Sequence, residues 1–413
     1  MLPSAATISN DARRVHTDAP ERHAEHFLQN VPGALHLAVD GWTCPTSESY
    51  LGVIVFWNAP GERKVSRAIL DFIMFALLLL FNGLNTHRAV NVRLTESHTG
   101  NYLAERIHDC LSRFGIADKV LSVCCDNAAN NGTIVTRLQE LLPNFEGPSA
   151  RVRCLPHVVN LVAKSFMSLF TSPQPSQSAL ASSGSSGSHS GTGDLVSGDI
   201  DPDKLEYDNT VIRGATAQAI QKMEAAGLVL TSSEMSASRK IIPGVARIAR
   251  RVHDSATLTQ RFRELIIQDP ALQGCTRSLT RLVVTRWNSY QAALDSCIYF
   301  QGPVQMLTSS SQLGLRSHAL TDEQWEIGEE LRDVLEIFQG ITDCFSQAEV
   351  PLIHDALPEL LSLRTALYDV RDDRLSLGLR SVTRVAAEAA LTTPVKYLNE
   401  MLESDIYVVA IGM

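Results

Sequence analysis

The chain has 413 residues, of which 45% are hydrophobic and 20% are charged, a balance typical of soluble globular proteins with room for about two or three domains. Its eight cysteines include no C-x-x-C pair, which argues against a structural zinc site or a disulfide framework and favours a reducing compartment. The formal net charge of -9 excludes a generally basic surface, so any DNA-binding surface must be local.

The beginning of the sequence shows no charged-then-apolar signal peptide. One apolar run covers 68–81, but it contains Asp71 and is shorter than the roughly 20 residues that a membrane span needs. We therefore expect a buried strand or helix in this run, and no membrane partner.

The pattern of apolar residues changes between a period of two and a helical period along the first 170 residues. It predicts three strands, then a helix that Gly115 ends, then an alternation of strand and helix. The predicted elements are strands at 35–42, 50–57 and 63–73, a helix at 99–114, a strand at 119–125, a helix at 134–142, a strand at 151–154 and a helix at 156–170. This order predicts an α/β ribonuclease-H-like mixed sheet covered by helices.

Composition divides the chain further. Residues 1–30 are predicted to be an irregular lead-in, 31–170 the sheet domain, and 171–206 a flexible Ser/Gly-rich loop. The remaining residues, 207–413, show amphipathic helical periodicity and a capping-box pattern in TDEQ at 321–324, which predicts an all-α insertion domain.

Two carboxylates follow the strands that such a fold places at its centre. Asp40 comes at the end of the first strand and Asp126 directly after the fourth. Carboxylates on neighbouring strand ends can hold a pair of Mg²⁺ or Mn²⁺ ions about 4 Å apart, which would activate and stabilise the oxygens of a phosphodiester. The alternative is that Asp40 caps a turn and Asp126 caps the next helix.

The best candidate for a cationic surface is the segment 239–263, which contains Arg247, Arg250 and Arg251. It could contact DNA phosphates. An ordinary solvated helix face is an equally good interpretation of this spacing.

Five blocks in order resemble hAT-superfamily DNA transposases over about 290 residues: LHLAVDGWT with YLGVIVFW, VLSVCCDNAANN, RCLPHVVNL, TRWNS and LTDEQW. The resemblance implies metal-dependent DNA cleavage and strand transfer, with Asp40 and Asp126 as two of three metal ligands. It implies Cys154 and His157 near the scissile phosphate. A helix-start histidine with ordinary hydrogen bonds is the alternative for His157.

The same resemblance implies that Trp287 stacks on a base extruded from the DNA and that Arg286 contacts a phosphate. An ordinary buried tryptophan is the alternative for Trp287. The resemblance also implies a nuclear protein with DNA as its partner and self-association as transposases require.

The sequence departs from the family pattern in three places. The family's third catalytic carboxylate and its dimerisation block are expected beyond SDIYVVAIGM, where the helical domain is still incomplete. Met74–Val92 resembles an insertion, as a retained intron would give. The zinc-finger module that is common in the family is not seen. We therefore expect a truncated, transposase-derived protein that binds DNA and holds metal weakly without cleaving. The alternative is a catalytically inactive scaffold for protein-protein interaction.

Overall fold

The computed structural model describes residues 28–43, 49–58, 61, 64–75, 100–127, 129–171, 202–283, 287–347 and 350–412. The chain packs as two compact units. One, here called the sheet unit, draws on residues 1–154, 348–354 and 401–413, and the other, the helical unit, on 155–347 and 355–400.

The sheet unit contains five strands and its principal helices in the predicted order. These elements are β1 (Leu35–Thr43), β2 (Ser49–Asn58), β3 (Val65–Phe75), α3 (Gly100–Arg113), β4 (Val120–Cys125), α4 (Ala129–Leu141) and β5 (Arg151–Arg153), joined by the short turns η1 (Ala117–Lys119) and η2 (Gly147–Ala150). The predicted strands and helices of this part are thus confirmed in kind and order, with ends that differ by a few residues. Gly115 has φ of 65°, the left-handed conformation expected at a helix end.

The five strands form one mixed sheet in the order β3-β2-β1-β4-β5. β1 pairs antiparallel with β2 and parallel with β4, and β4 pairs parallel with β5. The two strands predicted to be adjacent and central, β1 and β4, are therefore neighbours. A mixed sheet of this kind is compatible with an RNase-like fold.

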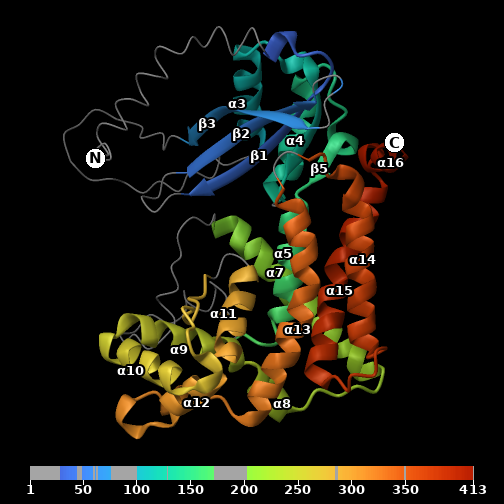
Figure 1. Cartoon of the computed structure of the whole chain (residues 1–413). Helices are drawn as coiled ribbons and strands as arrows, with labels where there is room; N and C mark the ends of the chain where they lie inside the picture. The colour runs from blue at the N-terminus through green and yellow to red at the C-terminus, as the bar shows by residue number, and fades with distance from the viewer. Residues whose placement is uncertain are drawn as a thin grey trace, which may run out of the picture. The chain divides into compact units, whose positions relative to one another are not determined.

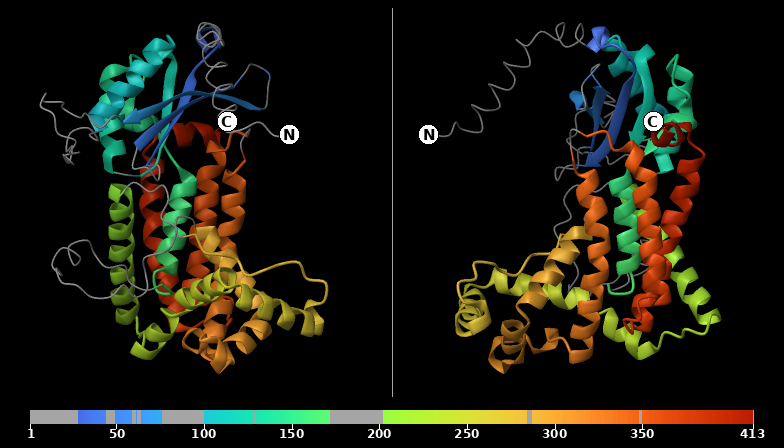
Figure 2. Two further views of the ribbon diagram at one scale, coloured as in Figure 1. Left: turned by 90° about the vertical axis from the view of Figure 1, so that its left-hand side faces the viewer. Right: turned by 45° about the vertical axis from the view of Figure 1, so that its right-hand side comes forward.

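Helices α3 and α4 cover one face of this sheet (Figures 1 and 2). Every second residue of β1, namely Leu35, Leu37 and Val39, points to that face and is buried. They pack in one core with Ile107 of α3 and Ile134 of α4. The two helices meet at Gly100, where a Cβ atom would lie 2.6 Å from the carbonyl oxygen of Asn130, so this position requires glycine.

A C-terminal helix, α16 (Asp405–Gly412), belongs to the sheet unit although more than 250 residues separate it from β5. The hydroxyl of Tyr407 accepts a hydrogen bond from the backbone N–H of Arg153 at 2.7 Å. Ser404 donates to the carbonyl oxygen of Ser149 at 2.7 Å. Ile406 packs against the sheet core. The sheet unit is thus completed by residues that the sequence alone predicted to lie in the helical domain.

The helical unit is all-α within its described residues. Its helices are α5 (Leu155–Met167), α7 (Pro202–Ala225), α8 (Ser232–Ser238), α9 (Ile241–Asp254), α10 (Ala256–Gln268), α11 (Trp287–Tyr299), α12 (Gln301–Ser309), α13 (Asp322–Phe345), α14 (Ile353–Asp372) and α15 (Ser381–Leu402), with short turns η3 (Pro270–Leu272), η4 (Ser311–Leu313) and η5 (Arg316–His318). Thr321 and Gln324 form the predicted capping box at the start of α13. No helix in the described ranges is long and apolar enough to cross a membrane.

The division between the units differs from the predicted one. The first and longest segment of the sheet unit ends at Cys154, and α5, which was predicted to belong to the sheet domain, packs with the helical unit. Phe166 of α5 lies 6.4 Å from Phe338 of α13, measured between ring centroids. The reason is that α5 is apolar around most of its surface and can contribute to a helical core. The predicted insertion at 74–92 lies outside the described residues except Met74 and Phe75, which end β3.

Candidate functional site

The two predicted carboxylates lie just beyond the last paired residues of the parallel strands β1 and β4. Asp126 follows the end of β4, whereas Asp40 lies within β1, which continues to Thr43, and is paired with Gly52 of β2. Leu37 and Ala38 of β1 are paired with Val123 and Cys124 of β4. Continuing this register by two residues places Asp40 beside Asp126. Because side chains alternate along strands, both carboxylates then belong to the sheet face opposite α3 and α4.

The register of β5 extends the same row. Cys125 is paired with Arg153, and the backbone N–H of Cys154 donates to the carbonyl oxygen of Cys125. One further step places Cys154 beside Asp126. We call Asp40, Asp126 and Cys154 the strand-end row. Ligand sites in open α/β sheets form at the carboxyl ends of parallel strands, where this row lies.

The two carboxylates of the row differ in environment. Asp126 is 8% exposed, and its Oδ1 accepts a hydrogen bond from the side-chain amide of Asn131 at 2.5 Å. Its backbone carbonyl accepts from the guanidinium of Arg151 at 2.8 Å. Asp40 is exposed. Asn131 and Arg151, which the sequence did not single out, thus fix the loop that carries Asp126.

The thiols beside the row are held in their neutral form. Burial raises the pKa of Cys124 well above its usual range, and the neighbouring Cys154, Cys125 and Asp40 raise it further. Burial likewise raises the pKa of Cys125. The influence of Asp40 on Cys124 agrees with the register, which gives both side chains the same face of the sheet. These cysteines are therefore poor nucleophiles and poor metal ligands at neutral pH.

The strand-end row does not fit a two-metal site. Within the described ranges no group of three or more His, Cys, Asp or Glu side chains is placed to hold a metal ion. One oxygen of Asp126 already accepts a short hydrogen bond from Asn131. Two carboxylates without a third ligand leave most of the coordination to water. No catalytic step through metal is therefore derived for these residues.

His157 lies at the start of α5 in the helical unit and is paired with a residue that the sequence did not indicate. Its Nε2 lies 3.5 Å from Oδ1 of Asp208 in α7, and the two side chains are 9% and 8% exposed. Neither atom has a closer hydrogen-bond partner among the described residues. The structure thus gives His157 a buried ionic neighbour from a helix beyond the Ser/Gly-rich segment.

Trp287 begins α11 and is 3% exposed. Its ring lies 5.7 Å from that of Phe338, and its backbone N–H donates to Oδ1 of Asn160 in α5 at 3.1 Å. The ring is thus buried, as in the alternative of an ordinary buried tryptophan, and the base-stacking role that the resemblance implied stays a prediction. The contact with Asn160 ties two sequence blocks, RCLPHVVNL and TRWNS, into one core. Arg286 lies outside the described residues.

The three arginines predicted to bind DNA lie on α9 and are exposed, but they are not equivalent. Arg250 pairs with Asp254 at 3.4 Å, and Asp254 also pairs with Arg281. Arg247 and Arg251 form no ion pair with a carboxylate among the described residues. They lie four residues apart on one face of the helix. Both lower the pKa of His318 in the turn η5, in addition to the larger effect of its burial.

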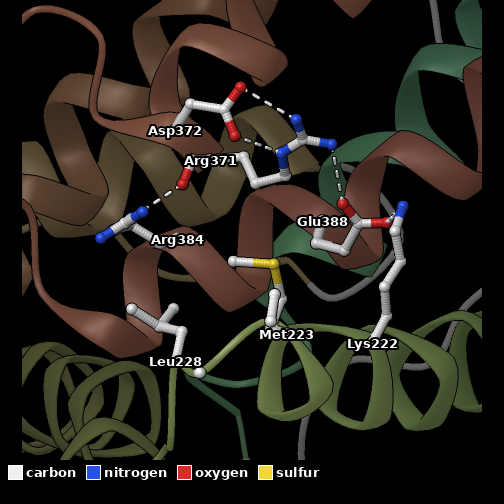
Figure 3. Close-up of a pocket in the computed structure, with 9 residues that line it drawn as sticks. Lys222, Met223, Leu228, Arg371, Asp372, Arg384 and Glu388 are labelled. Atoms are coloured by element: carbon white, nitrogen blue, oxygen red, sulfur yellow. Dashed lines mark hydrogen bonds and ion pairs between the residues drawn. The ribbon is translucent and has the colours of Figure 1, made fainter.

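A separate polar cluster lines a cavity of the helical unit between α7, α14 and α15 (Figure 3). The carboxylate of Glu388 is 7% exposed and pairs with Lys222 at 2.5 Å and with Arg371 at 3.2 Å. Arg371 also pairs with Asp372 at 2.6 Å, and its carbonyl oxygen accepts from Arg384 at 2.8 Å. The charges in this cavity largely neutralise one another, so the cluster has a structural role in joining three helices.

Comparison with known proteins adds information for the sheet unit. Residues 84–147 match the family described as the ZBED1 RNase-like domain. This match begins inside the predicted insertion at 74–92 and extends past α4 into the residues before β5. It supports an RNase-like fold for the sheet unit.

Three curated proteins are similar to part of the chain. The "Putative transcriptional regulator tpeD" of Talaromyces stipitatus is 29% identical over 166 residues, which is 39% of this chain and 17% of that protein. The zinc finger BED domain-containing proteins RICESLEEPER 1 and RICESLEEPER 2 of Oryza sativa subsp. japonica are 25% and 24% identical over 153 residues, which is 35% of this chain and 18% of each protein. The similar segment thus spans less than a fifth of these relatives. With the RNase-like match, the similarity supports a relation to a transposase-derived, hAT-like family.

Proposed function

We propose that this chain is an hAT transposase-derived nuclear protein that binds DNA and does not cleave it. The observation that carries the proposal is the pair Arg247 and Arg251, exposed on α9 and without a carboxylate partner among the described residues. In a chain with a net charge of -9, such a local excess of positive charge is a candidate contact for phosphates. The names of the relatives, a putative transcriptional regulator and BED zinc finger proteins, support a role at DNA in the nucleus.

The binding is proposed to be electrostatic and independent of base sequence. It does not rely on stacking by Trp287, whose side chain is buried. Each arginine that contacts a phosphate releases condensed counterions, and the affinity should therefore fall steeply with salt.

A salt titration of the full chain with a labelled double-stranded oligonucleotide tests this proposal. Replacing Arg247 and Arg251 together with Ala should make the slope of log affinity against log salt less negative, by roughly 0.9 for each phosphate contact that is lost. Arg261→Ala on α10 is a matched control, because Arg261 is exposed and pairs with Glu264. Equal losses in the double variant and the control would contradict the proposed surface.

The proposal that the chain does not cleave DNA rests on the residues of the strand-end row. Asp40 and Asp126 would bind Mg²⁺ or Mn²⁺ only weakly, because two carboxylates cannot fix both ions relative to a scissile phosphate. Incubation of supercoiled plasmid with the chain and either ion should leave the plasmid intact. Nicking that disappears in Asp126→Asn would overturn this part of the proposal.

A scaffold for protein-protein interaction is the second candidate function. It is favoured by the net charge and by apolar side chains on β3, where Ile69 and Phe72 are 60% and 55% exposed. Absence of salt-dependent DNA binding in the titration above would favour this candidate over the first.

A further inference from the structure

The turn η5 lies directly against α9 because α9 has a glycine at the point of contact. A Cβ atom on Gly244 would lie 3.0 Å from a methyl group of Leu320 and 3.8 Å from the carbonyl oxygen of His318. The absence of a side chain at Gly244 thus allows the segment that contains His318 to approach the helix closely.

The next positions on the same stripe of α9 are the two unpaired arginines. Arg247 and Arg251 follow Gly244 by three and seven residues, the spacing of one helix face. Their positive charges act on His318, which is half-buried. Three side chains that can donate hydrogen bonds to an anion therefore gather on one side of α9: two guanidinium groups and one imidazole.

The other charged groups near His318 leave this excess of positive charge in place. The helix α12, which also packs against η5, contains no titratable residue in Gln301–Ser309. Arg316 lies on the same turn and is exposed. Asp322 and Glu323 begin α13 a few residues later, and neither pairs with Arg247 or Arg251. The nearest acidic residue on α9 itself, Asp254, is occupied by Arg250 and Arg281.

We propose that Arg247, Arg251 and His318 together bind one backbone phosphate of DNA, and that His318 takes up a proton when the phosphate binds. This inference rests on the proposed DNA binding and specifies its site and its regulation. In the free protein, burial and the two arginines lower the pKa of His318, so the imidazole is neutral at neutral pH. A bound phosphate offsets the positive charge of the arginines and accepts a hydrogen bond from the protonated ring. Binding and protonation should therefore favour each other.

Arg250 should differ from the other two arginines of α9, with which the sequence grouped it. Arg250 is paired with Asp254 and should contribute little, whereas Arg247 and Arg251 should each contribute roughly tenfold in affinity, the value of one charge-assisted hydrogen bond. Equal losses in Arg250→Ala and Arg251→Ala would overturn the assigned site. These exposed side chains can be replaced without disturbing the core.

The proton linkage is tested by binding of the full chain to a double-stranded oligonucleotide at about pH 6 and about pH 8, at constant ionic strength. We expect several-fold tighter binding at the lower pH, together with net proton uptake seen by calorimetry in buffers of different ionisation enthalpy. His318→Gln should bind as the unchanged protein does at the higher pH and should lose the proton uptake. His108→Gln is the matched control, because His108 is a half-buried histidine of the sheet unit, far along the chain from α9 and η5.

The outcomes separate this inference from the proposed function. If the unchanged chain does not bind DNA, the proposed function fails. If it binds through Arg247 and Arg251 but His318→Gln keeps the pH dependence, the inference about His318 is overturned and the proposed function stands. Inorganic phosphate at a matched concentration of phosphate groups should not compete with the oligonucleotide. Full competition would overturn the proposal that the site binds a phosphate of the DNA backbone and would indicate a site for a free anion.

Discussion

The sheet unit and the helical unit use polar side chains in different ways. In the sheet unit the core is apolar, and the polar groups of interest lie beyond it: Asp126 follows the end of β4, and Asp40 lies within β1, three residues before its end. In the helical unit, polar contacts lie inside the packing. Glu388 joins three helices, and Asn160 of α5 accepts from the start of α11.

The difference has a physical origin. Strand register is fixed mainly by backbone pairing and by the alternation of buried side chains, so it depends little on the polar contacts that the sheet does contain, such as His36 with Ser122. Long amphipathic helices can slide or rotate against each other at little cost, and specific buried polar contacts select one arrangement. Single substitutions should therefore cost more at the internal contacts of the helical unit than at the row of the sheet unit.

The largest effect is expected for Trp287→Ala. Removing a ring that is 3% exposed and packs against Phe338 should lower the free energy of unfolding by about 3–5 kcal/mol. Urea denaturation followed by far-UV circular dichroism measures this, with Trp287→Phe as a milder control. Unchanged stability combined with loss of DNA binding would instead return Trp287 to the base-stacking role that the resemblance implied.

A smaller loss is expected for Glu388→Gln. The substitution leaves Lys222 and Arg371 without their shared buried carboxylate, but Lys222 is 64% exposed and regains water. We therefore expect the free energy of unfolding to fall by about 2 kcal/mol, which is less than the loss expected when a fully buried ion pair is broken. Chemical denaturation measures the change, and Lys222→Met should cost less than Glu388→Gln. A larger loss of stability in Lys222→Met than in Glu388→Gln would show that Lys222, rather than Glu388, is the main stabilising residue of this cluster.

Alkaline pH should destabilise both units through buried thiols. Burial raises the pKa of Cys110 in the sheet unit to about 11 and that of Cys297 in the helical unit to about 12. The folded state keeps these protons while the unfolded thiols lose theirs, so stability is complete below about pH 9 and falls as the pH rises toward the folded values. At about pH 10 each buried thiol should lower the free energy of unfolding by roughly 1 kcal/mol.

The two thiols should differ only at higher pH. The loss from Cys110 should level off near the pKa of about 11, while the loss from Cys297 continues toward about 12. Comparing the pH dependence of unfolding in Cys110→Ala and Cys297→Ala with that of the unchanged chain measures each contribution. A variant with the same pH dependence as the unchanged chain would show that its thiol is not protected by burial.

The smallest effect is expected for Tyr407→Phe in the sheet unit. The change removes the acceptor of the Arg153 N–H while it keeps the ring, and should cost about 1 kcal/mol. Amide hydrogen exchange reports it locally, because the N–H of Arg153 should exchange faster in the variant. Unchanged exchange at Arg153 would mean that α16 does not hold the edge of the sheet through this contact.

Local patterns predicted the elements of the sheet unit well. The signals were short-range: alternation in LHLAVDGWT, the apolar run in YLGVIVFW and a helix end at Gly115. The structure has β1, β2 and the end of α3 at these positions. The partners of the candidate residues were not predictable in the same way. Asp208 lies 51 residues from His157, and Asn160 lies 127 residues from Trp287, so no local spacing signals either contact.

The sequence by itself determined the order of strands and helices, the position of Asp126 directly after a strand, and a cationic segment in an acidic chain. These depend on side-chain periodicity and composition, which neighbouring residues determine. Tertiary structure decided that Trp287 is buried, that Arg250 is paired while Arg247 and Arg251 lower the pKa of His318, and that α16 completes the sheet unit. These depend on which distant segments pack together, because burial and ion pairing arise only where two such surfaces meet.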